Sequence, residues 1–295
     1  MSTDQYGPIG GGHNRNRTGA DESRVVLRFR GIHLAAANPQ IYDYLLTLPD
    51  EVALIWGSHW TVTKAIFFLN RYIPFANIGI GIYSDFGYNT SNATCHALYS
   101  TIAWMIICGV AVTMTIFILR TWAIWGKNQI IGYGLGILLL MACIAMSVLV
   151  QRILRSVEFT PVVPISPNLR GCFITKADTL QYICYAITLA YESVIIVLTL
   201  IKGWQHLRTS NSRLVVLLYR DGILAYLLIF ASSIANVLVL LLGPLEYADL
   251  LILTQRVIHV ILTNRIFLNI RRSALARRLV MTRPEVIELE DIRST

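Results

Sequence analysis

Six stretches of this chain are predominantly apolar, and each is long enough to form a helix that crosses a membrane. They lie at residues 61–83, 97–119, 130–150, 181–201, 223–242 and 246–262. About 20 residues of α-helix cover the roughly 30 Å hydrocarbon core of a bilayer. Lipid offers the backbone no hydrogen-bond partner, so an apolar segment is stable there when its own helix satisfies the N–H and C=O groups. The pattern therefore predicts a bundle of transmembrane helices.

A further segment, at about residues 32–56, is interrupted by polar side chains. They are Asn38, Pro39, Gln40, Asp43, Asp50 and Glu51. A charged group near the middle of a bilayer costs about 2.5–3.5 kcal/mol on insertion scales, so this segment spans only if its neighbours shield these groups. We include it as the first of about seven spans. The alternative is an altered or truncated N-terminal exon.

The rest of the chain adds no soluble domain. Residues 1–30 are rich in Gly, Asn, Arg and Asp and predict a disordered tail without a cleaved signal peptide. Residues 31–272 form one helical transmembrane domain, and residues 273–295 form a cytoplasmic C-terminal tail. With 55% hydrophobic and 14% charged residues, the chain is too apolar for a soluble protein. The expected fold class is all-α, a polytopic helical membrane bundle with receptor-like topology.

The basic residues alternate between the ends of the predicted helices. A net charge of +8 would suit a nucleic-acid-binding protein only if these residues formed one face of a soluble module, so we expect no nucleic-acid partner. The connections at residues 84–96 and 243–247 contain no Lys or Arg, whereas residues 202–221 and the chain after residue 262 are rich in them. By the positive-inside rule the basic connections and the C-terminus face the cytoplasm. The connection at residues 151–180 carries four basic residues and fits this orientation least well.

Several short motifs together resemble a known group of proteins. D-Y-L-L-T, P-D-E-V and F-F-L-N-R-Y occur within residues 41–77, and R-T-W-A-I-W-G-K-N, Y-R-D-G and R-I-F-L-N-I-R-R follow further along the chain. In this combination the sequence resembles fungal (mushroom-type) multi-pass membrane proteins that carry the N-terminal domain of unknown function 6533. The resemblance covers nearly everything from Tyr42 to Arg272. It implies about seven spans and no assigned activity.

Four side chains on the predicted outer side are candidates for covalent modification. Cys95 precedes the third span, and Cys172 lies in the connection between the fourth and fifth spans. An oxidising compartment would let these cysteines form a disulfide that ties this connection over the bundle, as in rhodopsin-type receptors; two unpaired thiols are the alternative. Asn89 and Asn92 begin N-x-S/T triplets and are predicted glycosylation sites, so the protein is expected to be a glycoprotein.

An intramembrane polar cluster is predicted from four ionisable side chains near the middle of the spans: Asp43, Arg71, Glu192 and Arg256. At 1.5 Å per residue their depths predict two pairs, Asp43 with Arg71 and Glu192 with Arg256. Such groups usually face the bundle interior or an aqueous cavity and mark a ligand or ion path. The alternative is that neutralised pairs only fix the register of the helices. Other polar residues that are expected to join these networks are Asn70, Asn236, Gln255 and His259.

The sequence contains no motif that is typical of a catalytic or cofactor-binding site. The sequence has no metal-ligand spacing, nucleophile elbow, phosphate loop or dinucleotide fingerprint, so we predict no catalytic residue, cofactor or metal and no enzyme activity. The basic residues Arg271, Arg272, Arg277 and Arg278 fit either a topological anchor or a short helix on anionic lipid. We expect a receptor-like or sensory protein in the plasma membrane or an endomembrane. A small transporter or channel, or a structural membrane protein, is the alternative.

Overall fold

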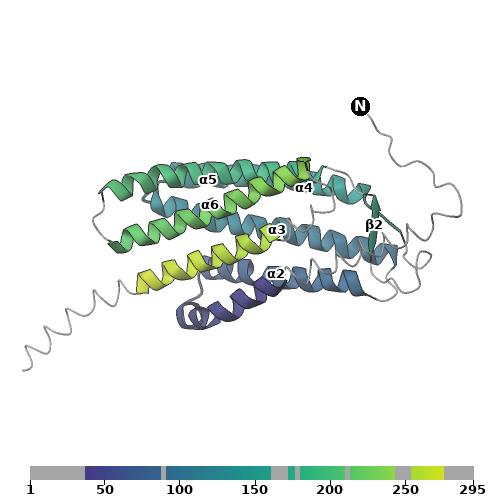
Figure 1. The fold of residues 1–295 in the computed structure, drawn as a ribbon, viewed down its shortest axis with the longest axis horizontal. Coiled ribbons are helices and arrows are strands. Elements are labelled where there is room, and N and C mark those ends of the chain that lie inside the picture. The colour runs from purple at the N-terminus through teal and green to yellow at the C-terminus, as the bar shows by residue number, and fades with distance from the viewer. Residues whose placement is uncertain are drawn as a thin grey trace, which may run out of the picture.

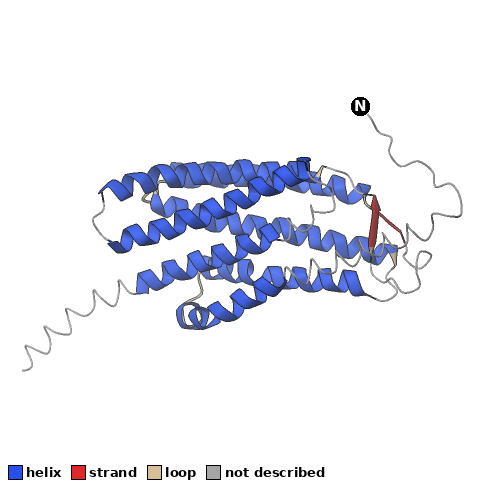
Figure 2. Ribbon diagram, in the orientation of Figure 1, coloured by secondary structure: helices blue, strands red, loops and turns tan. Residues whose placement is uncertain are grey.

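The computed structural model describes residues 37–87, 91–160, 172–176, 180–209, 213–242 and 254–275. These residues form helices that lie side by side along one long axis, with a short two-stranded ribbon at one end (Figures 1 and 2). The labelled elements are the π-helix η1 (Val52–Trp56), α2 (Val62–Phe86), α3 (Asn92–Ile124), α4 (Gln129–Ser156), β1 (Glu158–Thr160), β2 (Phe173–Lys176), α5 (Gln181–Thr209) and α6 (Arg213–Leu242). Two more helices cover residues 37–51, which continue into η1, and residues 254–275.

Four of the helices are long and apolar enough to cross a membrane: α2, α3, α4 and the Gln181–Gln205 part of α5. A shorter apolar stretch, Ile223–Val239, lies in α6. Large apolar side chains cover the outside of the bundle, and on α4 the side chains of Ile130 and Tyr133 are 81% and 70% exposed. Water would disfavour so much exposed apolar area, whereas lipid does not. The pattern indicates an integral membrane protein.

The helices extend beyond the apolar stretches that predicted them. Helix α3 covers Asn92–Ile124 instead of residues 97–119, and the last helix continues to residue 275 instead of ending at 262. The predicted start of the C-terminal tail, at residue 273, therefore lies inside a helix. Polar flanks can continue a helix because caps satisfy its end groups; the Ser91 side chain, for example, accepts a hydrogen bond from the Thr94 N–H.

The motif R-T-W-A-I-W-G-K-N forms the tight turn between α3 and α4. Gly126 and Lys127 both have left-handed backbone conformations, with φ of 64° and 62°. This conformation ends α3, and the Asn128 side chain then accepts a hydrogen bond from the Ile130 N–H and caps the start of α4. The indole N–H of Trp125 donates to the Leu198 carbonyl at 3.2 Å and fixes the turn against α5. The motif thus stops one helix and starts the next.

The apolar core has two parts. In the larger part, side chains from α3, α4, α5 and α6 pack together: Met114, Phe117, Leu135, Tyr191, Ile195, Ile196, Tyr226 and Ile229. The smaller part joins η1, α2 and the last helix through Ile55, Phe67, Phe267 and Leu268. The rings of Phe67 and Phe267 are stacked there with their centroids 4.8 Å apart. In Figure 1 the last helix (yellow) accordingly lies beside the first helix (purple), and α6 lies on its other side.

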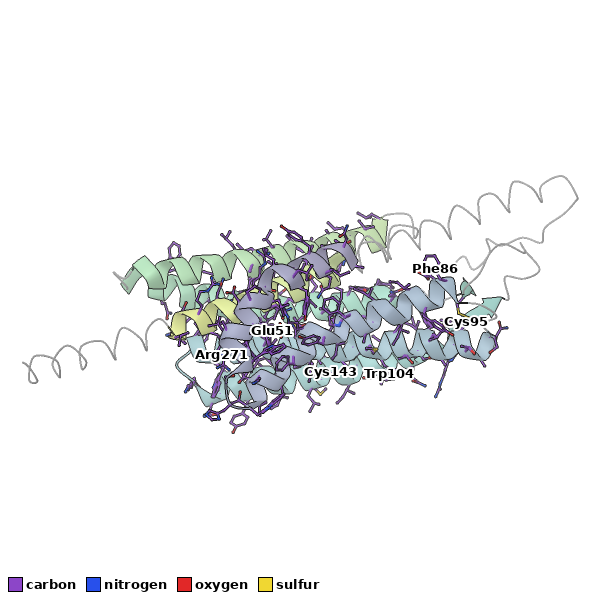
Figure 3. All side chains as sticks on the ribbon, turned by 90° about the horizontal axis from the view of Figure 1, so that it is seen from below. Glu51, Phe86, Cys95, Trp104, Cys143 and Arg271 are labelled. Carbon is purple, nitrogen blue, oxygen red and sulfur yellow. A yellow bond between two sulfur atoms is a disulfide. The ribbon has the colours of Figure 1, made fainter. Side chains whose placement is uncertain are left out.

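A disulfide joins the ribbon to the end of the bundle that also carries the start of α3. Cys95 and Cys172 are bonded across a sequence separation of 77, as the sequence predicts (Figure 3 labels Cys95). The Cys172 N–H also donates to the Ser84 carbonyl at 3.0 Å, so the connection is tied to α2 as well as α3. β1 and β2 pair in antiparallel fashion beside this bond. The arrangement fixes the predicted outer ends of three helices relative to one another.

We expect loss of this disulfide to destabilise the protein. Cys95→Ser, Cys172→Ser and the double variant should each lower the free energy of unfolding by about 2–4 kcal/mol, because the bond closes a long loop. Thermal unfolding in mild detergent, followed by tryptophan fluorescence, measures the effect. All three variants should behave alike because they remove the same bond, and Cys108→Ser, which changes an exposed free thiol, should have little effect. Labelling of both thiols in the intact protein would contradict the bond.

Candidate functional site

Arg71 in α2 is the centre of a buried polar group in the half of that helix that follows the turn after η1. Its side chain is 1% exposed, and its Nε atom lies 2.5 Å from Oε2 of Glu51. The guanidinium also donates to Oγ1 of Thr47 at 2.9 Å and to the Tyr44 carbonyl at 3.1 Å. The Tyr44 ring lies 4.7 Å from the guanidinium carbon. Arg71 therefore contacts residues over two turns of the helix at 37–51, and its charge is neutralised within the bundle.

Glu51 connects this group to the turn between the first two helices. Its second oxygen accepts hydrogen bonds from the indole N–H of Trp56 and the hydroxyl of Tyr72, both at 3.1 Å. Beyond Trp56, the ammonium group of Lys64 donates to the carbonyls of Trp56 and Ser58 at 3.0 and 2.7 Å. These carbonyls have no partner within the helix that ends there, so Lys64 satisfies them and places a positive charge at a negative helix end.

The helix at residues 37–51 has a polar buried face and an apolar exposed face. The buried side chains include Gln40, Asp43, Thr47 and Glu51, which lie on one side of the helix because they recur every three or four residues. The exposed side chains include Ile41, Tyr42, Leu45 and Leu46. A helix at a water interface has the opposite pattern. The polar residues that interrupt the first predicted span are thus turned toward the other helices.

The predicted pair of Asp43 and Arg71 is wrong. Asp43 instead pairs with Arg265 at 2.7 Å, and the exposed Asp50 pairs with Arg272 at 2.5 Å. Asp50 follows Asp43 by seven residues, and Arg272 likewise follows Arg265 by seven. The first and last helices therefore run parallel, and both pairs belong to the same register. Depth alone could not identify the partners, because Arg71 and Arg265 lie on different helices that both contact the first one.

A second buried polar group joins α5, α6 and the last helix. Glu192 accepts a hydrogen bond from Ser233 at 2.5 Å, and Ser233 accepts one from the amide nitrogen of Gln255 at 2.7 Å. Gln255 also contacts Asn236 and, at 3.4 Å, His259. Nε2 of His259 lies 3.5 Å from Oε1 of Glu192 and completes a ring of polar contacts. All five side chains are buried. We call them the Glu192 network.

The predicted pair of Glu192 and Arg256 does not form either. Arg256 extends toward α3, where its guanidinium lies so close to Gly109 that a Cβ atom there would collide with it. Successive helix positions are about 100° apart, so Arg256 faces a different neighbour from Gln255 and His259. Nε of Arg256 and Oε1 of Glu192 have no hydrogen-bond partner among the described residues. The four predicted residues therefore do not pair with one another. Asp43 and Arg71 have other ion-pair partners, Glu192 belongs to the Glu192 network, and Arg256 lies against α3.

A third contact extends these groups across the bundle. The amide of Asn70 in α2 donates to the side-chain carbonyl of Asn264 at 2.9 Å, and Thr113 in α3 donates to Asn70 at 2.8 Å. The last helix thus makes polar contacts with the first helix and with α2, α5 and α6, and its Arg256 lies against α3. Thr113 and Asn264 were not among the predicted site residues, although the recurrence of polar residues every three to five positions from Gln255 to Asn264 is a detectable signal.

The remaining predicted site residues lie at the ends of the bundle. Asn92 is exposed at the start of α3, and Asn89 lies outside the described residues. Arg271 and Arg272 are in the last two turns of the last helix, whereas Arg277 and Arg278 lie outside the described residues. Within the part of the chain that the structure describes, no three His, Cys, Asp or Glu side chains are grouped so that they could hold a metal ion.

Comparison with known proteins assigns one segment of the chain. Residues 32–76 match the sequence model of a family of unknown function (DUF6533). In the structure the described part of this segment is the first helix, η1 and the first half of α2, and it contains the Glu51–Arg71 pair. No curated protein matches the chain. The segment is therefore a helical hairpin whose interior is polar, and the comparison attaches no activity to it.

We expect two of the three arginine pairs of the first helix, Glu51–Arg71 and Asp50–Arg272, to differ in their contribution to stability. Arg71→Gln leaves Glu51 buried without its partner and should lower the free energy of unfolding by about 3–5 kcal/mol. Arg272→Gln breaks an exposed pair and should cost less than about 1 kcal/mol. Unfolding by SDS in mixed micelles, followed by tryptophan fluorescence, compares them.

Charge exchange distinguishes the observed pairing from the one predicted by depth. Exchange of Asp43 and Arg265, as Asp43→Arg with Arg265→Asp, should restore expression that either single change reduces. Exchange of Asp43 and Arg71 should not. Recovery by the second exchange and not by the first would contradict the pairing in the structure.

Proposed function

We propose that this chain, whose residues 32–76 carry the domain of unknown function, is a receptor-like membrane protein of the fungal multi-pass kind with seven spans. Four helices meet the length and hydropathy required of a span. The first helix, α6 and the last helix lie alongside them in the bundle (Figure 1). The apolar outer face of the first helix supports its inclusion as a span, with the N-terminus outside and the C-terminus in the cytoplasm.

The observation that carries this proposal is the set of buried polar contacts on the last helix. Glu192 lies about three turns into α5, or about 16 Å along the helix, which is close to the middle of a bilayer. Polar and ionisable groups at this depth are costly and usually mark a functional path. Oε1 of Glu192 and Nε of Arg256 retain hydrogen-bonding capacity. A small polar ligand that bound Oε1 of Glu192 would change the contacts of the last helix, which reaches the predicted inner surface.

The last helix also connects the Glu192 network to the predicted cytoplasmic side. Asn264 contacts α2, Arg265 pairs with the first helix, and Arg272 pairs with Asp50 near the end of that helix. A shift of the last helix would therefore move the inner end of the hairpin with it. Such coupling requires two arrangements of the helix that a ligand distinguishes by contact energy. A transporter or channel that uses the Glu192–His259 pair as part of a proton path is the second candidate.

The proposed topology predicts glycan at the outer end of α3. Expression in a glycosylating host should give a mobility shift that glycosidase reverses, and Asn89→Gln with Asn92→Gln should abolish it. Acceptor triplets introduced separately at the turn that contains Lys127 and after Leu275 should remain unmodified, because both positions are predicted to be cytoplasmic. Glycan at either introduced site would contradict this orientation.

We expect a change in the Glu192 network to alter the inner end of the last helix. A fluorophore on Leu275→Cys, in a background without the three free cysteines, reports this position. Glu192→Gln removes the charge with little change in shape and should shift the ratio of two label environments by at least about fivefold, the lower end of typical coupling. Ser193→Ala is the matched control, since its hydroxyl bonds only to the backbone of its own helix.

Other results of this experiment favour the other candidates. A variant that lowers stability but leaves the label unchanged would indicate that the network is structural and would reject the receptor proposal. Proton flux into vesicles that contain wild-type protein, lost in Glu192→Gln and retained in Ser193→Ala, would favour the transporter. A dye that responds to pH inside the vesicles measures this flux.

A further inference from the structure

We propose that a groove between α3 and α4 binds the phosphate head group and one acyl chain of an anionic phospholipid in the outer leaflet. The groove has a volume of about 370 Å³ and is lined by Trp104, Ser147, Val148, Gln151, Arg152 and Arg155. In the view of Figure 3, Trp104 lies between Cys143 and the end of the bundle that carries Cys95. This site is separate from the buried polar contacts of the last helix.

The groove spans the depth of one leaflet. Helix α4 ends at Ser156, so Arg152 and Arg155 lie within about 6 Å of its end and Ser147 about 14 Å from it. A leaflet contributes about half of the roughly 30 Å hydrocarbon core. The two arginines are therefore at the level of lipid head groups, whereas Val148 and Trp104 are beside the acyl chains. The polar end and the apolar end of the groove are arranged in the same order as those of a phospholipid.

Charge complementarity identifies the head group. Arg152 and Arg155 are exposed, and neither forms an ion pair with a described acidic residue. A guanidinium binds phosphate through two parallel N–H groups, which makes arginine the preferred partner of a phosphate ester. Residues Ser147, Gln151 and Arg155 recur every four positions, so their polar groups follow one face of α4 toward the head group.

The apolar part of the groove fits an acyl chain. Val148 is 53% exposed and Trp104 is 38% exposed, although both are large apolar residues. They come from different helices and face the same groove. A chain held between Val148 and Trp104 would pack α4, most of whose apolar residues are exposed, against α3.

This site also accounts for an exception to the charge pattern of the sequence. The connection after α4 faces outward in the proposed topology, yet Arg152 and Arg155 lie in the last turns of α4, just before that connection. Two simpler roles exist for these residues: a cation near the last turn of a helix interacts favourably with its negative end, and a long arginine side chain can extend to water without any ligand. Neither role needs Trp104, and neither depends on the head group of the surrounding lipid.

Native mass spectrometry of protein from nanodiscs tests the proposal. The discs contain phosphatidylcholine alone or with phosphatidylserine, and the ratio of the two lipids retained by the protein is measured. Wild-type protein should retain phosphatidylserine selectively. Arg152→Gln with Arg155→Gln should reduce this selectivity by about thirtyfold, the factor expected for two basic residues at an anionic surface. Lys127→Gln with Lys202→Gln removes the same charge from the predicted inner ends and should retain it.

Two further arms identify the lipid as the occupant. A phosphatidylserine with a photoreactive acyl chain should crosslink near Val148 in α4, and Val148→Trp, which fills the groove without a change in charge, should abolish that crosslink. Inorganic phosphate should not displace the retained lipid. Equal selectivity in the double arginine variant would overturn the proposal, as would displacement by inorganic phosphate, which would indicate a site for soluble anions. These results do not depend on whether the protein is a receptor.

Discussion

Polar groups inside a bilayer must find their partners within the protein, and here the last helix provides partners to four other helices. Gln255, His259, Asn264 and Arg265 each face a different neighbour or a different level of the bundle. Because lipid cannot solvate these groups, each contact favours one rotation and one depth of the helix relative to its neighbours. Apolar packing selects less strongly among arrangements of the helices, because an apolar helix surface has a similar energy against another helix and against lipid. The polar contacts therefore define how the helices fit together.

The hairpin formed by the first helix, η1 and α2 is also held together by buried polar groups that need partners within the protein. Glu51 and Arg71 are both almost fully buried, and together with Trp56 and Tyr72 they join the two helices close to the turn. Removal of one member leaves a charge in a region that water does not reach, whereas the exposed Asp50–Arg272 pair can be solvated. The hairpin is thus held by a buried charged group at one end and is attached to the last helix along its length. The outer face of the hairpin consists of apolar side chains that lipid can cover.

The two ends of the bundle are fixed by different kinds of bond. At the end with the ribbon, the Cys95–Cys172 disulfide and the Cys172–Ser84 backbone bond hold α2 and α3 to the connection before α5. At the other end, the first and last helices are joined by ion pairs such as Asp50–Arg272, which are weaker and depend on solvation. A covalent link resists relative movement of helices, while exposed ion pairs exchange readily. The end that carries the ion pairs is therefore the one better suited to conformational change.

The sequence by itself determined that the chain is mainly apolar helices, four of which in the described residues are long and apolar enough to cross a membrane. It also identified the cysteines that form the disulfide and the residues that are too polar for lipid. These properties depend on local composition and on the length of helix that a bilayer requires. Only the tertiary structure decided which of those polar residues meet. Asp43 pairs with Arg265 and Arg71 with Glu51, although depth counted along the chain placed Asp43 level with Arg71. Depth is one coordinate, and the choice of partner also depends on the rotation of each helix and on which helices are neighbours. Contacts between residues about 220 positions apart set both of these, and no local pattern in the sequence reports them.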